Sequence, residues 1–185
     1  SRSAFPTARV LILDAASGRT VREVSASAGE FRVPTWSPRE NLLAYVEKSE
    51  DDGNTLFLLD AESGDKAPLG TSSGMMSALW SPDGRYLAFG EAARSGSTNF
   101  SSIQIVDLES GRILPCINEA SAGFFWSPPG DALCYLSIDS QRSHLCWNLQ
   151  PRDGGEKVEL IRFLPSREQT LIMSFFDQYA LSHPP

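Results

Sequence analysis

One motif in this sequence has the residue types of a hydrolase nucleophile. Gly70-Thr71-Ser72-Ser73-Gly74 matches the Gly-x-Ser-x-Gly pattern, in which a strand before the motif and a helix after it expose the serine over an oxyanion hole. Here the residues that follow the motif are typical of a strand. We therefore interpret the motif as a loop between two sheets, and we predict no catalytic residue in the chain.

Metal-binding residue types are sparse. The two histidines are His144 and His183, and neither has a neighbouring ligand at helical spacing. Cys146 would share the strand face of His144, so a metal pair competes there with ordinary packing, which we favour. The acidic stretch 47–54 has Lys48 where an EF-hand loop would need its first aspartate. We expect no bound metal and no cofactor.

The three cysteines, Cys116, Cys134 and Cys146, form no Cys-x-x-Cys pair. Because their number is odd, they cannot all pair with one another. We interpret them as buried thiols, since an unpaired cysteine packs like a small hydrophobic residue. In an oxidising compartment, Cys134 and Cys146 are candidates for a disulfide if they face each other on adjacent strands.

The composition excludes several classes of partner. Of the 185 residues 41% are hydrophobic, which suffices for a core, and the net charge is −7. Such a charge disfavours nonspecific attraction to nucleic acid or anionic lipid. The best apolar stretch, residues 161–176, is interrupted by Pro165, Arg167 and Glu168, whereas a bilayer-spanning helix needs about 20 apolar residues. We expect no nucleic-acid partner and no membrane insertion.

Two motifs recur with a common period along the chain. The tryptophans of three Trp-Ser-Pro motifs are 44 residues apart (36 to 80) and then 46 residues apart (80 to 126). The aspartates of three Asp-x-x-Ser-Gly motifs are 46 and 47 residues apart. The motifs begin at Trp36, Trp80 and Trp126, and at Asp14, Asp60 and Asp107. A period of 40 to 50 residues indicates a propeller or a solenoid.

Each motif predicts a hairpin. Ser81-Pro82-Asp83-Gly84 has the residue order of a type I turn, and in the second motif Asp and Ser start a turn in which Gly accepts a positive φ. Strand-like runs flank both motifs, and about 45 residues with four short antiparallel strands make one blade of a β-propeller. The sequence therefore predicts an all-β chain of about three and a half blades. Their expected bounds are 9–25 (the two outer strands), 31–69, 75–116, 122–176 and 178–185 (the start of a further blade).

The last blade departs from the repeat. Asn148 replaces the marker aspartate, and residues 151–155 replace the compact turn. Residues 158–164 and 170–176 have the character of two long strands, which predicts one extra hairpin. Because Trp36, Trp80 and Trp126 recur once per blade, we expect their rings to fill the gaps between neighbouring sheets rather than to form a recognition stripe.

The motif Trp80-Ser81-Pro82-Asp83-Gly84, followed by Arg-Tyr-Leu-Ala-Phe, a strand and a Ser-Gly turn, resembles the WD-repeat-like propeller repeat of TolB and its relatives. The resemblance covers residues 9–185. It implies a non-catalytic platform for a protein partner, a periplasmic or other extracytoplasmic location, and further blades supplied by the rest of a longer chain. Fold alone does not decide function.

The longest variable connections are the expected sites of partner contact. They contain Glu50, Asp51 and Asp52 in the first, and Arg94 and Asn99 in the second. Two alternatives stay open: the gating propeller of a prolyl-oligopeptidase-like serine peptidase, and a propeller that binds a small ligand or a metal. In both, the chemistry would come from residues that the repeat itself does not identify.

Overall fold

The computed structural model describes residues 9–25, 31–48, 53–92, 94, 97, 99–139 and 144–166. Within these residues every regular element is a strand, and no helix is long and apolar enough to cross a membrane. The strands are β1 (Arg9–Leu13), β2 (Thr20–Ser25), β3 (Phe31–Trp36), β4 (Leu42–Lys48), β5 (Asn54–Asp60), β6 (Lys66–Ser72), β7 (Met76–Trp80), β8 (Tyr86–Glu91), β9 (Ser102–Asp107), β10 (Arg112–Ile117), β11 (Ser121–Trp126), β12 (Ala132–Asp139), β13 (His144–Pro151) and β14 (Val158–Phe163).

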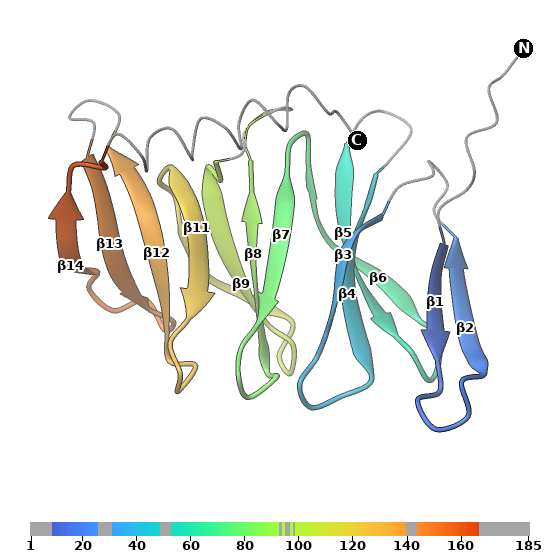
Figure 1. The fold of residues 1–185 in the computed structure, drawn as a ribbon. Coiled ribbons are helices and arrows are strands. Elements are labelled where there is room, and N and C mark those ends of the chain that lie inside the picture. The colour runs from blue at the N-terminus through green and yellow to red at the C-terminus, as the bar shows by residue number, and fades with distance from the viewer. Residues whose placement is uncertain are drawn as a thin grey trace, which may run out of the picture.

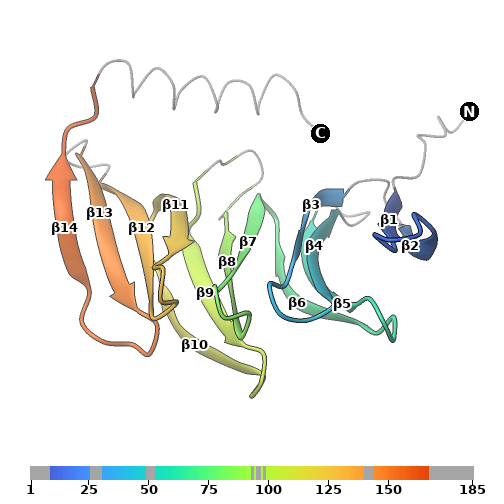
Figure 2. The same ribbon diagram turned by 60° about the horizontal axis from the view of Figure 1, so that its bottom comes forward.

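The strands form three four-stranded antiparallel sheets and one two-stranded sheet. Their orders are β3-β4-β5-β6, β7-β8-β9-β10 and β11-β12-β13-β14, with β1-β2 ahead of them. Each four-stranded sheet is a blade in which the chain runs in order from the first strand to the fourth. We count the two-stranded sheet β1-β2 as the first blade. Figures 1 and 2 show the sheets side by side in chain order. The predicted all-β fold of blades is confirmed.

The end of the chain holds two predictions that the structure does not reach. Residues 170–176, expected as the second strand of an extra hairpin, and 178–185, expected as the start of a further blade, lie outside the described residues. Residues 158–163 form β14, the fourth strand of the last described blade. The proposed hairpin partner of β14 therefore stays a prediction.

The Asp-x-x-Ser-Gly motifs close the turns between the third and fourth strands. The main-chain N–H groups of Gly18, Gly64 and Gly111 each donate to the carbonyl of the motif's aspartate at 2.8 Å. These glycines have φ between 67° and 87°, a region that side chains with a Cβ disfavour. The recurring glycine therefore marks a backbone requirement of the turn.

The position of the marker aspartate in the last blade differs from the prediction. Asp107 lies opposite Tyr86, the first residue of β8, and Pro151 lies opposite Ala132, the first residue of β12. Pro151 therefore takes the aspartate's place, and Asn148 belongs three residues deeper in β13. The prediction that Asn148 replaces the aspartate was therefore wrong, because the equivalent position is identified by the pairing register and not by the residue type.

Apolar side chains from neighbouring blades meet in three clusters, one at each seam between blades. The cluster between the third and fourth blades includes Ile103, Phe124 and Leu133, and that between the second and third includes Val46, Leu56 and Phe89. The cluster between β1-β2 and the second blade includes Ile12, Leu43 and Tyr45. The core of this protein is therefore distributed over seams rather than gathered in one centre.

Tryptophan joins two of the seams by hydrogen bonds as well as by packing. Trp80 Nε1–H donates to the carbonyl of Thr35, and Trp126 Nε1–H donates to the carbonyl of Leu79, both at 3.0 Å. In each case the acceptor is the residue before the tryptophan of the preceding blade. Trp36 lies in a different setting, with 48% of its surface exposed.

The two described thiols do not face each other. Cys134 pairs with Leu149 and Cys146 pairs with Ser137 across the β12–β13 ladder, so the two sulfurs project to opposite faces of the blade. Both cysteines are buried and free. The disulfide considered from the sequence is therefore excluded by the register of these strands, and burial raises the pKa of the Cys134 thiol.

Candidate functional site

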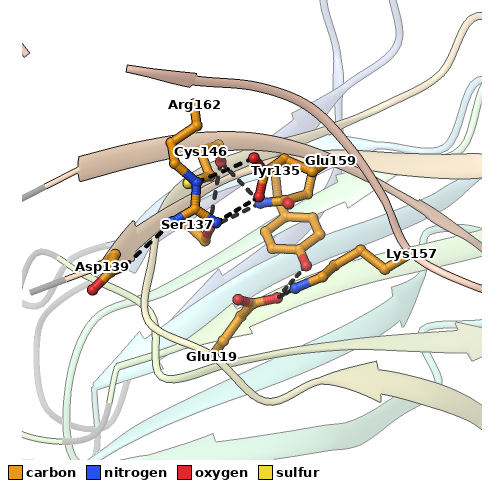
Figure 3. A network of polar contacts seen from close by, with 9 residues as sticks. Glu119, Tyr135, Ser137, Asp139, Cys146, Lys157, Glu159 and Arg162 are labelled. Atoms are coloured by element: carbon orange, nitrogen blue, oxygen red, sulfur yellow. Dashed lines mark hydrogen bonds and ion pairs between the residues drawn. The ribbon is translucent and has the colours of Figure 1, made fainter. Parts of the chain in front are cut away.

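A polar cleft lies on one face of the fourth blade. It encloses about 360 Å³. Its lining residues are Glu119, Ser137, Ile138, Asp139, Cys146, Asn148, Lys157, Glu159 and Arg162. Figure 3 shows side chains of this cleft converging from several strands of the blade and from the β10–β11 connection.

Strand register brings these side chains together. Ser137 on β12 pairs with Cys146 on β13, and Cys146 in turn pairs with Arg162 on β14. Residues paired across an antiparallel ladder project to the same face. Asn148 and Glu159 form a further pair, beyond an irregularity in the register, and so continue the same polar row. One face of one sheet therefore gathers residues that lie far apart in the sequence.

The floor of the cleft is formed by a buried amide. Asn148, 2% exposed, donates through Nδ2 to the Ser137 hydroxyl at 2.8 Å and to the Cys146 carbonyl at 2.9 Å. A buried amide without such acceptors would destabilise the sheet, because desolvation is costly unless hydrogen bonds replace water. The three residues thus position one another.

Glu119 connects the cleft to the apolar seam. It accepts a hydrogen bond from the hydroxyl of the buried Tyr135 and forms an ion pair with Lys157 at 2.9 Å. Burial and the neighbouring Glu119 carboxylate raise the pKa of Tyr135 well above its usual range, so the phenol stays protonated. Tyr135 therefore acts in this geometry as a fixed donor.

The outer wall of the cleft is an ion-paired arginine. Arg162 donates to both carboxylate oxygens of Glu159, at 2.7 and 3.1 Å, and contacts Asp139 at 3.5 Å. The hydrogen bonds from Arg162 lower the pKa of the Glu159 carboxyl. Both cations that line the cleft, Lys157 and Arg162, thus have a carboxylate partner.

The hydrolase-like motif is only in part the loop that we expected, because its first three residues, 70–72, are the end of β6 and pair with β5. The Ser72 hydroxyl donates to the carbonyl of Ala92 at 2.9 Å, and the Gly74 N–H donates to the Ser72 hydroxyl at 3.1 Å. The element that follows is β7, a strand, where a nucleophile serine would need a helix. Ser72 therefore ties the motif to the end of the third blade's second strand.

Of the residues expected to contact a partner, the structure describes Arg94 and Asn99, and these two do not line the cleft. Glu50, Asp51 and Asp52 fall outside the described residues. Arg94 is exposed, and Asn99 is half-buried with its N–H donating to the Ser97 hydroxyl at 3.3 Å. Arg94 and Asn99 belong to the β8–β9 connection, and neither lines the polar cleft.

The marker aspartates cap turns. Asp14 accepts from the N–H and the hydroxyl of Ser17, and Asp60 accepts from the N–H groups of Glu62 and Ser63. These hydrogen bonds hold the pKa of both carboxyls below the usual value. The aspartates thus have a structural task in the turn.

Metal-ligand residue types do not gather in the described part of the chain. It contains no cluster of three or more His, Cys, Asp or Glu residues arranged to hold a metal ion. His144, at the start of β13, lies opposite Asp139 and two residues from Cys146. His183 lies outside the described residues.

Asp107 has a further partner, the guanidinium of Arg85. Arg85 donates to both carboxylate oxygens, at 3.2 and 3.0 Å, and Ser110 donates through its hydroxyl at 2.9 Å. These hydrogen bonds, led by those from Arg85, hold the pKa of Asp107 far below its usual range. The bidentate pair ties the start of β8 to the end of β9.

We predict that Asp107→Asn lowers the melting temperature at neutral pH. Because the carboxyl's pKa is lower in the folded chain than the value of about 3.9 in an unfolded one, its stabilisation is complete above that value and is lost as the pH falls toward the folded pKa. The gap between the two melting curves should therefore narrow steadily below about pH 4. As a control, Asp153→Asn at an exposed turn should leave the melting temperature nearly unchanged at neutral pH. A gap that widened in acid would contradict the pairing.

The sequence did not predict the polar cleft. Its residues come from strands and connections separated by up to 43 positions (119 to 162), and none belongs to a repeated motif. The available signal was Asn148, a polar residue inside the apolar run of β13, where a buried partner was to be expected. The equivalent signal for Glu119 is absent, because the residue lies in a connection of ordinary polarity.

Solved structures share this architecture. The chain is similar to the β-propeller domain of the trilobed protease from Pyrococcus furiosus, with a TM-score of 0.65 and 14% identity over 84% of this chain and 49% of that one. It is similar to TolB from Acinetobacter baumannii, with a TM-score of 0.53 and 19% identity over 80% of this chain and 36% of that one. It is also similar to an acylaminoacyl peptidase from Pyrococcus horikoshii, with a TM-score of 0.62 and 14% identity over 84% of this chain and 28% of that one. No family model matches the chain, and no curated protein does.

These similarities define the class of protein. The fold is that of a β-propeller, and this chain spans half or less of the length of these three structures. TolB shares the fold, as the Trp-Ser-Pro repeat implied, and so do the propellers of peptidases. At these identities the likeness extends to the fold and leaves the activity to be argued from the chain itself.

Proposed function

We propose that this chain is a non-catalytic part of a propeller scaffold that holds a protein partner through one of its rims. The supporting observation is a difference between the two ends of the blades. At one rim the repeated Trp-Ser-Pro and Asp-x-x-Ser-Gly turns recur, whereas at the other the connections vary from blade to blade. We name the second the loop rim, and define it by the ends of β4, β8 and β12 and the starts of β5, β9 and β13 (Figure 1).

The repeated turns have structural duties. The Ser81 hydroxyl accepts the Tyr86 N–H at 2.9 Å, and Arg22 donates to the carbonyls of Ala61 and Glu62 at 3.1 and 2.9 Å. Replacing such residues for the sake of a partner would weaken a blade or a seam. At the loop rim, by contrast, the connections differ in length: they contain five, ten and four residues between the flanking strands. Loops on a rigid scaffold are where recognition commonly lies.

A photocrosslinking experiment tests the placement of the partner. A photoreactive benzoylphenylalanine at Arg94, on the loop rim, should give a discrete heavier product with a protein from the cells that make this chain. The matched position is Arg19, exposed in a repeated turn at the opposite rim, where we expect no such product. Equal crosslinking from both positions, or none from Arg94, would contradict the placement.

A loop exchange separates recognition from folding. Residues 93–98 are replaced by Asn-Gly, the residues of a two-residue hairpin turn, while Phe100, which packs at the seam with the fourth blade, is kept. The exchange should abolish capture of the crosslinked protein in a pull-down, and it should leave the melting temperature of the blades nearly unchanged. Retained capture would refute a role for the β8–β9 connection.

A gating propeller of a serine peptidase is the second candidate, since two of the similar structures belong to peptidases. The two proposals differ in what accompanies the propeller in the gene. A hydrolase domain encoded in the same reading frame supports the peptidase, and its absence from the full reading frame supports the scaffold.

A further inference from the structure

We propose that the second blade binds a small molecule with a guanidinium group at its repeated turns. The site is a surface pocket of about 360 Å³ between the β3–β4 turn and the β5–β6 turn. We call it the turn pocket, and its lining residues are Arg39, Glu40, Asn41, Leu42, Asp60 and Glu62. It lies at the rim opposite the loop rim, so this inference goes beyond the proposed scaffold function and does not depend on it.

The third blade shows a guanidinium at the corresponding place. There Arg85 donates to both carboxylate oxygens of Asp107, at 3.2 and 3.0 Å, and forms an ion pair with Glu109 at 2.9 Å. The guanidinium is therefore held by one carboxylate at the end of β9 and by a second in the turn that follows. Its planar fork of N–H donors suits such a pair of acceptors.

Asn41 takes the place of Arg85 in the second blade. Each of the two stands directly before the first residue of its blade's second strand. The main-chain carbonyl of each accepts the N–H of the residue after the motif's aspartate, which is Ala61 at 2.8 Å in the second blade and Leu108 at 3.1 Å in the third. Because an asparagine side chain is shorter than an arginine side chain and uncharged, the space and the charge of the guanidinium are not supplied by the second blade.

The second blade nevertheless keeps both carboxylates. Asp60 and Glu62 have the same spacing as their counterparts in the third blade. Asp60 accepts the N–H groups of Glu62 and Ser63 through Oδ1, at 2.8 and 3.0 Å, and Glu62 accepts the Asn41 side-chain amide through Oε1 at 2.5 Å. Neither carboxylate forms an ion pair with a side chain in the described part of the chain, whereas both counterparts pair with one arginine.

The two nearby arginines have other contacts. Arg22 donates to the main-chain carbonyls of Ala61 and Glu62, at 3.1 and 2.9 Å. Arg39 lies against Gly84 of the third blade, where an added Cβ would come within 3.0 Å of the Arg39 Cγ. Three carboxylates and one guanidinium line the turn pocket, which gives it a net charge of −2. This charge favours a cation, and the volume lies at the lower end of the range for small-ligand sites.

Agmatine is the probe for the unmodified chain, because it has a guanidinium and an amine but no carboxylate that the pocket would repel. We expect saturable binding in isothermal titration calorimetry, with one agmatine per chain. Putrescine has the same charge without the guanidinium fork, so it should bind about tenfold more weakly. Equal affinities for the two compounds, or no saturable binding of agmatine, would contradict the proposal.

Asn41→Arg supplies the guanidinium from within the chain. This variant restores the arrangement of the third blade, so it should have a higher melting temperature and should bind agmatine about tenfold more weakly or less. Asn41→Gln is the control, because it lengthens the side chain without adding a charge, and it should retain most of the binding. If Asn41→Arg bound agmatine as tightly as the unmodified chain does, the proposed position would be wrong.

Glu62→Gln tests one of the two carboxylates. It removes a negative charge and keeps the shape of the side chain, so it should weaken agmatine binding by about tenfold, with little change in melting temperature. Asp153→Asn makes the same change of charge at an exposed turn of the fourth blade and should leave the affinity unchanged. Equal weakening by both variants would show that agmatine responds to the overall charge of the chain, and would overturn a site at this turn.

Discussion

Replacing Trp126 by alanine should lower the free energy of unfolding by about 3–5 kcal/mol, which is the usual cost of removing a buried large aromatic side chain. Trp126 is 9% exposed and packs in one cluster with Leu133 and Tyr86. Its ring centroid lies 6.3 Å from that of Tyr86, and its Nε1–H donates to the Leu79 carbonyl. The truncation removes ring contacts with both blades and leaves the Leu79 carbonyl without its indole donor. Chemical denaturation followed by circular dichroism measures the loss.

Trp36→Ala is the matched control for this substitution. The residue type and the place in the repeat are the same, but Trp36 is 48% exposed and makes no hydrogen bond across a seam within the described residues. Its truncation should cost less than half as much, because the transfer of a half-exposed ring from water contributes correspondingly little. Equal losses for the two variants would mean that burial at the seam is not what the repeated tryptophan provides.

Gly90→Ala should destabilise the protein by about 1–3 kcal/mol through overpacking. A Cβ at Gly90 would lie 2.7 Å from Phe100 and 2.8 Å from Phe124. These two rings form an edge-to-face pair across the seam between the third and fourth blades, with centroids 5.4 Å apart. Neither ring can move away without opening the cluster, so β8 or β11 must shift. Thermal unfolding of the variant beside the parent chain measures the effect.

Gly123→Ala provides the control for Gly90→Ala. Gly123 is also a strand glycine, on β11, but a Cβ there would meet no atom within 4 Å. This substitution should be neutral or slightly stabilising, because alanine restricts the unfolded chain more than glycine does. If the melting temperature of Gly90→Ala lies well below that of Gly123→Ala, the effect is a packing requirement at Gly90 rather than a general effect of glycine in strands.

The blades could be predicted from sequence because the repeat reports on local constraints. A turn that needs a positive φ requires glycine, and a carboxylate that caps a turn must stand at a fixed distance from it. Asp60 and Gly64, or Asp107 and Gly111, therefore indicate the same hairpin wherever they recur. The tryptophan recurs for a different reason, since the indoles of the third and fourth blades meet the same carbonyl position on the preceding blade.

Pairing register and the cleft could not be predicted in this way. Whether Asn148 or Pro151 replaces the aspartate depends on which residue lies opposite Ala132, and the motif gives no information on this when its residue types change. The separation of the two described cysteines depends on the same ladder. The polar cleft draws Glu119 and Arg162 from segments that only the folded sheet brings together.

The unequal tryptophans also connect architecture to function. At two seams the indole donates a hydrogen bond to the preceding blade. The second, third and fourth blades therefore form one stacked unit (Figure 2). If the chain acts as the proposed scaffold, recognition at the loop rim depends on this packing at the seams.

The most direct test of the stacked-blade account is a nuclear Overhauser measurement on the indole protons. We expect contacts from Trp126 Hε1 to the α protons of Leu79 and Trp80, and from Trp80 Hε1 to those of Thr35 and Trp36, between residues more than forty positions apart. If both indole protons instead show contacts to residues of their own blade alone, neighbouring sheets do not meet as described here.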